Sequence, residues 1–180
     1  MNTLRKIRVL NHIQRCCLFP LIKPTSVAEH SFHVAIMCVF VCDELKREGK
    51  EIDELKVLKK ALFHDCEETF TSDVPYTMKI HLKEKITATV NKIVGGEFPG
   101  APTWFTEIVK EECDGSLEHW IVKLCDMMEL NLYCLDEIEM GNKHVLPMLK
   151  RGMDVAWEIN KNEVKSLYMA DILDRIWQMC

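Results

Sequence analysis

The stretch from Asp53 to Asp65, DELKVLKKALFHD, decides the fold because a helical pattern runs directly into two side chains that can carry chemistry. An aspartate at its start is typical of a helix N-cap, and apolar residues then recur at helical spacing. The inward face of this helix is expected to carry Leu55, Leu58, Leu62 and Phe63. The helix is expected to end near the dipeptide His64-Asp65.

The rest of the chain has the same helical period. Ser26 and Glu29 form a capping box, a hydroxyl with a carboxylate three residues on, which predicts the start of a helix. Helices are expected over about 4–13, 26–49, 80–94, 104–109 and 116–141, and from Pro147 toward the C-terminus with a bend near Gly152. Loops are expected at 16–25, 69–77 and 98–103, where proline, glycine and small polar residues gather. Since no alternating strand pattern of useful length appears, the sequence predicts one all-α domain over residues 1–180.

Composition narrows the function classes. The formal net charge of −5 over 180 residues argues against a long nucleic acid as partner, because phosphate backbones require clustered basic residues. The longest apolar run, Val34–Cys42, is too short to span a bilayer. No signal peptide is expected, because the basic residues Arg5, Lys6 and Arg8 are followed by Asn11, His12, Gln14 and Arg15 rather than by an apolar stretch. The nine cysteines include no C-x-x-C pair and are read as buried thiols in a reducing cytoplasm.

One set of side chains points to chemistry: His30, then His64-Asp65, then Asp126. Two imidazoles and two carboxylates converging from three helices would hold a divalent metal and leave coordination positions open for a reaction. Adjacent helical residues point about 100° apart, so His64 and Asp65 reach one ion only at a helix end. His33, roughly on the same helix face as His30, is the main rival ligand.

Asp126 interrupts an otherwise apolar stretch from Ile121 to Met128. A carboxylate buried there is unfavourable unless it is paired or coordinates a metal, so a ligand role is favoured. A lone histidine on a helix is more often a core or surface residue than a ligand. That interpretation is kept for His12, His81, His119 and His144.

In this order, His30, His64-Asp65 and Asp126 match the H…HD…D signature of the HD-domain phosphohydrolase superfamily, a helical bundle. Within it, the chain closely resembles the YfbR-like 5′-deoxynucleotidases. The resemblance is carried by Arg15, 20–26, 28–31, 63–68, 73–79 and 123–126. The phage-encoded dATP triphosphohydrolases are a second similar group, and the short length of the chain favours them slightly.

The resemblance implies roles for individual residues. It selects His30 over His33 as the ligand, and it makes Glu68 the residue that orients or deprotonates the attacking water. Without the motif, Glu68 would be read as a solvated carboxylate at a helix end. The residues implied on the phosphate side are Arg15 and Lys79, and those on the sugar or base side are Asp73, Pro75, Cys16 and Leu18.

One position departs from the family. Relatives have a tryptophan after the arginine, against the 2′ carbon of the sugar, where this chain has Cys16. Phe19 is a candidate to replace it from a shifted loop.

The function implied is removal of the 5′-phosphate group or groups of a small-molecule 2′-deoxynucleotide, with dATP as the first expectation and a deoxynucleoside monophosphate as the alternative. The cofactor is expected to be one divalent ion, Mn²⁺, Co²⁺, Zn²⁺ or Fe²⁺, since mixed histidine and carboxylate ligation suits all four. A cytoplasmic homo-oligomer, a dimer or an assembly of dimers, is also expected. The location would be the host cytoplasm if the chain is phage-encoded. Two rival classes are a metal-bound nucleotide sensor without turnover and a helical interaction protein with a structural metal.

Overall fold

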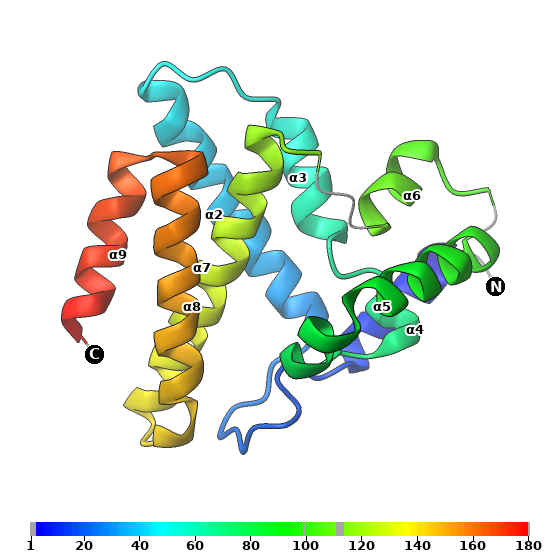
Figure 1. Cartoon of the computed structure of the whole chain (residues 1–180), viewed down its shortest axis with the longest axis horizontal. Helices are drawn as coiled ribbons and strands as arrows, with labels where there is room; N and C mark the ends of the chain where they lie inside the picture. Colours follow the sequence, from blue (N-terminus) through cyan, green and yellow to red (C-terminus); the bar gives the residue numbers. More distant parts are fainter. Residues whose placement is uncertain (1–2, 99, 111–113, 180) are drawn as a thin grey trace. The chain divides into compact units, whose positions relative to one another are not determined.

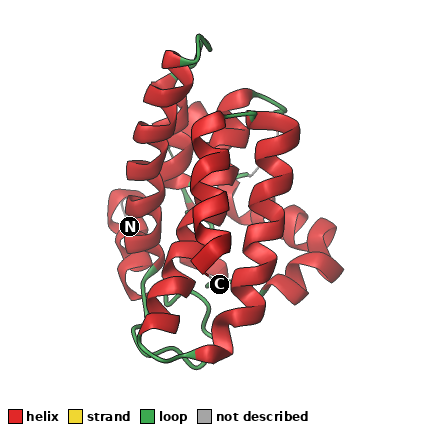
Figure 2. Cartoon of the chain, turned by 90° about the vertical axis from the view of Figure 1, so that its left-hand side faces the viewer, coloured by secondary structure: helices red, strands yellow, loops and turns green. Residues whose placement is uncertain are grey.

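The computed structural model describes residues 3–98, 100–110 and 114–179 of the 180-residue chain. The elements, labelled in Figure 1 where there is room, are α1 (Thr3–Ile7), η1 (Arg8–His12), α2 (Val27–Arg47), α3 (Glu54–Phe63), α4 (Glu68–Thr71), α5 (Tyr76–Glu97), α6 (Thr103–Val109), α7 (Leu117–Glu139), η2 (Lys143–Val145), α8 (Leu146–Ile159), η3 (Asn160–Val164) and α9 (Leu167–Met179). Across these described ranges the ribbon is helix and loop without a strand (Figure 2), and only Gln14 and Ser26 form an isolated antiparallel bridge. The predicted all-α class is confirmed.

The chain forms two compact units. The first comprises Met1–Pro20, Pro24–Phe32 and Leu62–Glu112, and the second comprises Leu21–Lys23, His33–Ala61 and Cys113–Cys180. Helices α2 and α3 therefore each contribute one end to each unit. The single domain over residues 1–180 stays a prediction.

Helix starts follow the capping residues of the sequence. At α2 the Glu29 backbone N–H donates to Ser26 Oγ at 3.2 Å, and Glu29 Oε2 accepts the Ser26 N–H at 2.8 Å, so the predicted capping box is confirmed. Asp53 Oδ1 accepts the Lys56 N–H at 3.0 Å before α3. Ser116 Oγ accepts the His119 N–H at 3.2 Å before α7. Each bond satisfies a backbone donor that the first turn leaves unpaired.

The inward face of α3 differs from the expectation. Val57 and Ala61 are fully buried, whereas Leu55 is 63% exposed and Leu62 is 45% exposed. Both sets have helical spacing, so periodicity alone could not separate them. The smaller side chains of Val57 and Ala61 let α3 pack closely in the second unit's core, while Leu58 lies at its edge.

Two predicted boundaries around α4 and α5 are wrong. The expected loop over 69–77 contains the short helix α4, and α5 begins at Tyr76 rather than near residue 80. The expected end near residue 94, before the pair Gly95-Gly96, is also wrong, because α5 continues to Glu97. Glycine disfavours a helix by only about 1 kcal/mol, which packing can offset. The irregularity in α5 is instead a kink at Leu82, where φ is −124° and ψ is 16°.

The expected last helix with a bend near Gly152 is two helices. The chain leaves α8 through the π-helix η3 and turns at Lys165, which has left-handed backbone angles of 54° and 42°. Gly152 has another role, because a Cβ atom built on it would lie 2.2 Å from Asn131 Oδ1 of α7. The glycine thus permits the close contact of α7 and α8, which lie side by side (Figure 1).

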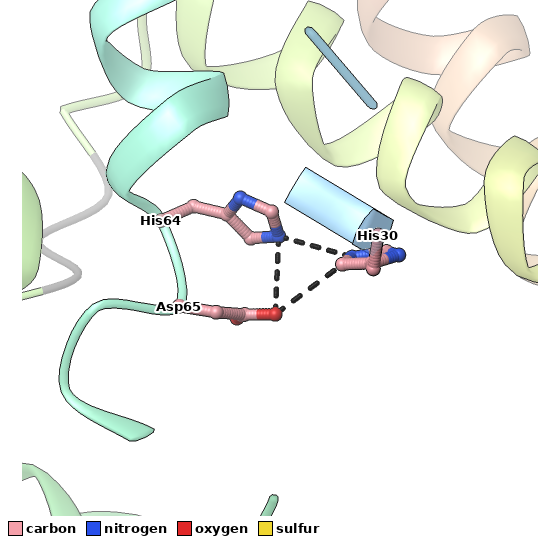
Figure 3. Close-up of side chains that lie close together, drawn as sticks. All are labelled: His30, His64 and Asp65. Atoms are coloured by element: carbon pink, nitrogen blue, oxygen red, sulfur yellow. Dashed lines mark hydrogen bonds and ion pairs between the residues drawn. The ribbon is translucent and has the colours of Figure 1, made fainter. Parts of the chain in front are cut away.

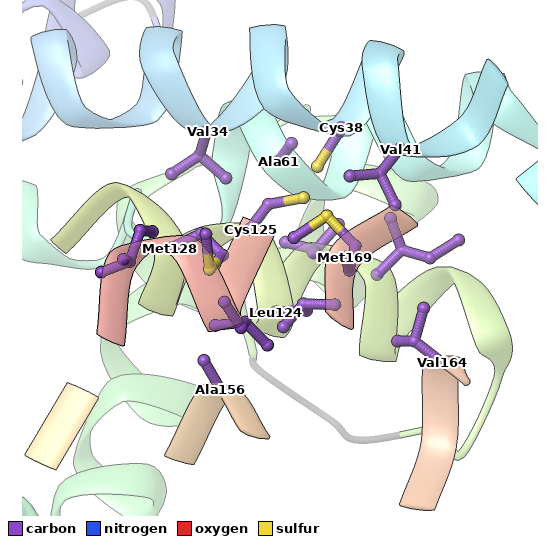
Figure 4. Packing of buried hydrophobic residues seen from close by; sticks show 14 of the residues in the cluster. Val34, Cys38, Val41, Ala61, Leu124, Cys125, Met128, Ala156, Val164 and Met169 are labelled. Atoms are coloured by element: carbon purple, nitrogen blue, oxygen red, sulfur yellow. The ribbon is translucent and has the colours of Figure 1, made fainter. Parts of the chain in front are cut away.

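Each unit has its own apolar core. In the second, side chains from α2, α3, α7, α8 and α9 interleave, with Cys38 and Cys125 among them (Figure 4). In the first, aromatic rings pack edge to face, with Phe98 and Phe105 centroids 5.0 Å apart. In the segment expected as a helix over about 4–13, Leu10 is buried in this core, while Leu4 is exposed. None of the helices in the described part of the chain has the length and apolar character needed to cross a bilayer.

Candidate metal centre

His30 lies in the first turn of α2 and is fully buried. The capping box at Ser26 and Glu29 fixes where this helix begins, and the His30 N–H donates to the Ser26 carbonyl at 3.0 Å. The position of the imidazole is therefore set by local sequence, four residues after the cap.

His64 and Asp65 occupy the turn that follows α3. The helix ends at Phe63, and residues 64–67 form a turn before α4, closed by the Cys66 N–H to the Phe63 carbonyl at 3.1 Å. Both side chains are buried. This is the interrupted helix end that the adjacent pair requires if both are to face one point.

Figure 3 shows the three side chains converging. His30 Nε2 and His64 Nε2 lie 3.3 Å apart, and Asp65 Oδ2 lies 3.3 Å from His64 Nε2 and 3.7 Å from His30 Nε2. A tetrahedral ion with bonds of about 2.0–2.1 Å has ligand atoms about 3.3 Å apart, so these separations fit a metal with little movement. The donor types suit Mn²⁺, Co²⁺, Fe²⁺ or Zn²⁺.

Two further acids lie beside Asp65. Glu67 and Glu68 are both buried, and each can place a carboxylate oxygen within 4.8 Å of one of Asp65. Buried carboxylates are unfavourable unless cations balance them. Three buried acids gathered within this distance are a donor set that could hold a divalent cation.

Arg15 is joined to the cluster directly. Its Nη1 donates to Asp65 Oδ2 at 2.7 Å, and both side chains are largely buried. The backbone of Arg15 is fixed because its N–H donates to the Thr25 carbonyl at 2.9 Å. The resemblance implied a phosphate-binding cation here, and its contact with a candidate ligand was not predicted.

Asp73 contacts the neighbouring loop. Its Oδ2 accepts the Cys16 N–H at 2.6 Å, while Cys16 has a φ of 53° and Ser72 a φ of 59°. Left-handed backbone angles are unfavourable at residues other than glycine. Here they occur at Cys16, which donates this hydrogen bond, and at Ser72, which precedes the acceptor Asp73. Residues 15 with 65 and 16 with 73 are far apart in the chain, so no local pattern could have shown either contact.

The remaining predicted residues are less tightly placed. Pro75 is the N-cap of α5, Leu18 is 70% exposed, and the side chain of Lys79 lies outside the described part of the structure. Asp126 is buried on α7 in the second unit, and its place in the ligand set stays a prediction. The rival His33 is exposed and lies 3.7 Å from Glu129.

Cys66 also lies within this segment. Burial raises the pKa of its thiol, and the neighbouring Glu67 and Asp65 raise it further. The Cys66 side chain is fully buried and packs in the apolar core of the first unit.

Comparison with solved structures identifies the fold. An HD-domain phosphohydrolase of Listeria innocua superposes with a TM-score of 0.78 at 22% identity, covering 96% of this chain and 87% of that one. The HD phosphohydrolase DatZ of cyanophage S-2L, bound to dA and one catalytic Zn²⁺ ion, gives a TM-score of 0.68 at 19% identity over 97% and 92% of the two chains. The fold is that of the HD-domain phosphohydrolases.

Comparison of the amino-acid sequence with known proteins identifies the family within this fold. A 5′-deoxynucleotidase of Vibrio parahaemolyticus is 28% identical over 162 residues, covering 83% of this chain and 80% of that protein. The family model of the YfbR-like 5′-deoxynucleotidases matches residues 2–176. The chain therefore belongs to the YfbR-like 5′-deoxynucleotidase family, as its sequence motifs indicated.

Proposed function

We propose that the protein is a metal-dependent phosphohydrolase that removes the 5′-phosphate of 2′-deoxynucleotides and releases the deoxynucleoside. The observation that carries the proposal is the convergence of His30, His64 and Asp65, three buried donor atoms at separations that suit one ion. Membership of a 5′-deoxynucleotidase family supports the substrate class.

Different residues of the proposed site bind the metal, bind the phosphate and activate the attacking water. His30, His64 and Asp65, with Asp126 proposed as a fourth ligand, would hold a divalent ion, which when bound acts as a Lewis acid toward a phosphate oxygen. Arg15 and Lys79 bind the remaining phosphate oxygens through charge-assisted hydrogen bonds. Glu68, buried three residues past Asp65, orients the attacking water and accepts its proton.

On the sugar side, Asp73 accepts a hydrogen bond from the 3′-hydroxyl, with Pro75 and Leu18 beside the sugar or base. Cys16 occupies the position where relatives have a tryptophan. Its short side chain leaves more room beside the 2′ carbon of the sugar, so we propose that ribonucleotides are also hydrolysed measurably. The alternative is that Phe19 packs against the 2′ carbon in place of the tryptophan and disfavours ribose. A deoxy-over-ribo preference of a thousandfold or more in kcat/KM would support Phe19 in that role.

The leaving group distinguishes two forms of this activity. Deoxynucleoside monophosphates are the favoured substrates, because the family model and the Vibrio relative are both described as 5′-deoxynucleotidases. The sequence expectation of dATP as substrate is kept as the second form, since the fold is shared with the phage enzyme DatZ. A nucleotide sensor without turnover is the rival from another class.

A nucleotide panel separates these functions. Purified protein would be incubated with dAMP, dATP and AMP, each with Mn²⁺, Co²⁺ or Zn²⁺, and the products resolved by chromatography. Deoxyadenosine from dAMP alone supports the monophosphatase, and deoxyadenosine with tripolyphosphate or three phosphates from dATP supports the triphosphohydrolase. Binding without product under every condition would contradict both forms and favour the sensor.

We also propose that the protein works in the cytoplasm as a homo-oligomer, a dimer or an assembly of dimers. Light scattering on the purified protein measures the oligomeric state.

A further inference from the structure

The ion pair of Arg15 and Asp65 is placed by fixed backbone on both sides. Arg15 is held beside the residues that precede α2, through its N–H bond to Thr25 and the bridge between Gln14 and Ser26. Asp65 is held in the turn after α3. With the side chains 12% and 6% exposed, the 2.7 Å contact is a largely desolvated, charge-assisted bond. Arg15 is therefore aimed at Asp65 by the fold and is not a surface cation that happens to reach it.

One oxygen atom of Asp65 lies close to the arginine and to both histidines. Asp65 Oδ2 accepts from Arg15 Nη1 at 2.7 Å, and the same atom lies 3.3 Å from His64 Nε2 and 3.7 Å from His30 Nε2. An ion held by the two imidazoles and this oxygen would share Oδ2 with the guanidinium. Two cations on one carboxylate oxygen repel each other, and the repulsion is strong where water is largely excluded.

We propose that Arg15 couples metal binding to phosphate binding. Before metal binds, Arg15 holds and neutralises Asp65. When a divalent cation takes Oδ2, the hold of Asp65 on the guanidinium weakens, and the phosphate oxygens of the substrate accept it instead. This inference rests on the proposed function, which supplies the metal and the phosphate.

Two consequences follow from this competition. Arg15 lowers the affinity of the protein for metal alone, because the cation must displace part of an existing ion pair. Phosphate raises metal affinity, because it stabilises the displaced guanidinium. Reciprocity requires that metal raise phosphate affinity by the same factor.

Titration of the protein with MnCl₂, followed by the electron paramagnetic resonance of free Mn²⁺, tests the coupling. The proteins are wild type, Arg15→Gln and, as a matched control, Arg8→Gln, which removes an exposed cation of the same unit. Without phosphate, Arg15→Gln should bind Mn²⁺ at least about fivefold more tightly than wild type, the lower end of typical coupling. Arg8→Gln should stay within about twofold.

Adding inorganic phosphate provides the second readout. Phosphate should tighten Mn²⁺ binding at least about fivefold in wild type and in Arg8→Gln, and by much less in Arg15→Gln. Equal or weaker Mn²⁺ binding by Arg15→Gln without phosphate would overturn the competition. If phosphate tightened Mn²⁺ binding as strongly in Arg15→Gln as in wild type, the proposed transfer of the guanidinium from Asp65 to phosphate would be wrong.

The melting temperatures of the variants show whether each one is folded. Since Arg15→Gln leaves Asp65 without its arginine, this variant should melt at a lower temperature without metal, and Mn²⁺ should raise its melting temperature more than that of wild type. If Arg15→Gln does not fold, Arg15→Lys replaces it, because lysine keeps the charge and lacks the planar fork. Weaker phosphate coupling with unchanged Mn²⁺ affinity in Arg15→Lys supports the proposal, and full coupling contradicts it.

No nucleotide is used in these titrations. Coupling without any turnover of deoxynucleotides would refute the proposed function alone, and turnover without coupling would refute this inference alone. Failure of the wild-type protein to bind any of Mn²⁺, Co²⁺ and Zn²⁺ would refute both.

Discussion

At the scale of single residues, Glu68 is the sharpest test of the chemistry. It is buried beside Asp65 but lies outside the cluster of His30, His64 and Asp65. We predict that Glu68→Ala binds Mn²⁺ with affinity near that of wild type and hydrolyses substrate at least about a hundredfold more slowly, the lower end for a positioned base. Phosphate release and Mn²⁺ titration measure the two effects.

Glu84→Ala, an exposed carboxylate on α5, is the control and should leave the rate unchanged. If Glu68→Ala lost Mn²⁺ rather than rate, Glu68 would be a ligand and its assignment as base would be wrong.

Asp73 has two candidate roles that a pair of substitutions can separate. Its contact with the Cys16 N–H needs an acceptor oxygen, which asparagine retains, whereas the 3′-hydroxyl contact is strongest with a charged acceptor. We predict that Asp73→Asn weakens binding of 2′-deoxynucleotides by about 1.5 kcal/mol or more and leaves 2′,3′-dideoxy analogues nearly unchanged. Binding is measured by calorimetry with the substrate series.

Asp73→Ala, which also removes the acceptor for Cys16, should weaken both substrates and lower the melting temperature. Equal weakening of both substrates by Asp73→Asn would show that Asp73 acts only by holding the loop.

Much of the cluster could be predicted at this scale. The capping box fixes His30 in the first turn of α2, and the end of an apolar helix fixes His64 and Asp65 in a turn, so local sequence brings these three side chains to ordered positions. The Arg15–Asp65 pair could not be predicted, because it joins segments 50 residues apart whose register depends on the whole first unit. The same holds for Cys16 and Asp73.

At the scale of secondary-structure elements, the contact of α7 and α8 depends on Gly152. An alanine there would place its Cβ 2.2 Å from Asn131 Oδ1, and Asn131 is fully buried. We predict that Gly152→Ala lowers the free energy of unfolding by about 1–3 kcal/mol, the usual effect of overpacking. Chemical denaturation measures the change.

Gly96→Ala on α5 is the matched control, since nothing lies within 4 Å of the added atom, and its effect should stay within about 1 kcal/mol. The double variant Asn131→Ala, Gly152→Ala should recover most of the loss. A Gly152→Ala protein as stable as wild type would contradict the steric account.

The helices themselves were largely predictable, and their ends and inward faces less so. Caps at Ser26, Asp53 and Ser116 fixed three helix starts. The pattern of α3 allowed two apolar stripes, and the buried one was decided by the close packing of Val57 and Ala61. The break at Lys165 carries no glycine or proline signal, and it arises from the turn between the two last helices.

At the scale of the whole molecule, a buried acid links folding to pH. Glu137 of α7 accepts the N–H groups of Ile22 and Lys23 at 2.8 and 2.7 Å and the amide of Asn142 at 2.6 Å. Burial raises the pKa of Glu137, but these hydrogen bonds outweigh it, and the pKa lies below its ordinary value. The charged form is therefore favoured by folding, and its stabilising effect is present above the unfolded pKa and lost as the pH falls through the folded one.

We predict that Glu137→Gln is less stable than wild type at pH 7 by about 2 kcal/mol, the scale of hydrogen bonds to a charged acceptor. The difference should shrink as the pH falls from about 5 to about 3, on either side of the ordinary glutamate pKa. Thermal melts across this range measure it, with the exposed Glu139→Gln as control. A difference that does not change with pH would show that Glu137 contributes only packing.

The most direct test of the metal centre is to measure Mn²⁺ binding and phosphate release from dAMP in wild type, His64→Ala and the control His81→Ala, whose imidazole is exposed on α5. The account predicts that His64→Ala keeps its helical circular dichroism and cooperative melting, because the apolar cores form without the ion. It also predicts that this variant loses Mn²⁺ binding and phosphate release, while His81→Ala retains both. Near wild-type turnover by His64→Ala at saturating Mn²⁺ would contradict the assignment of His30, His64 and Asp65 as the metal centre.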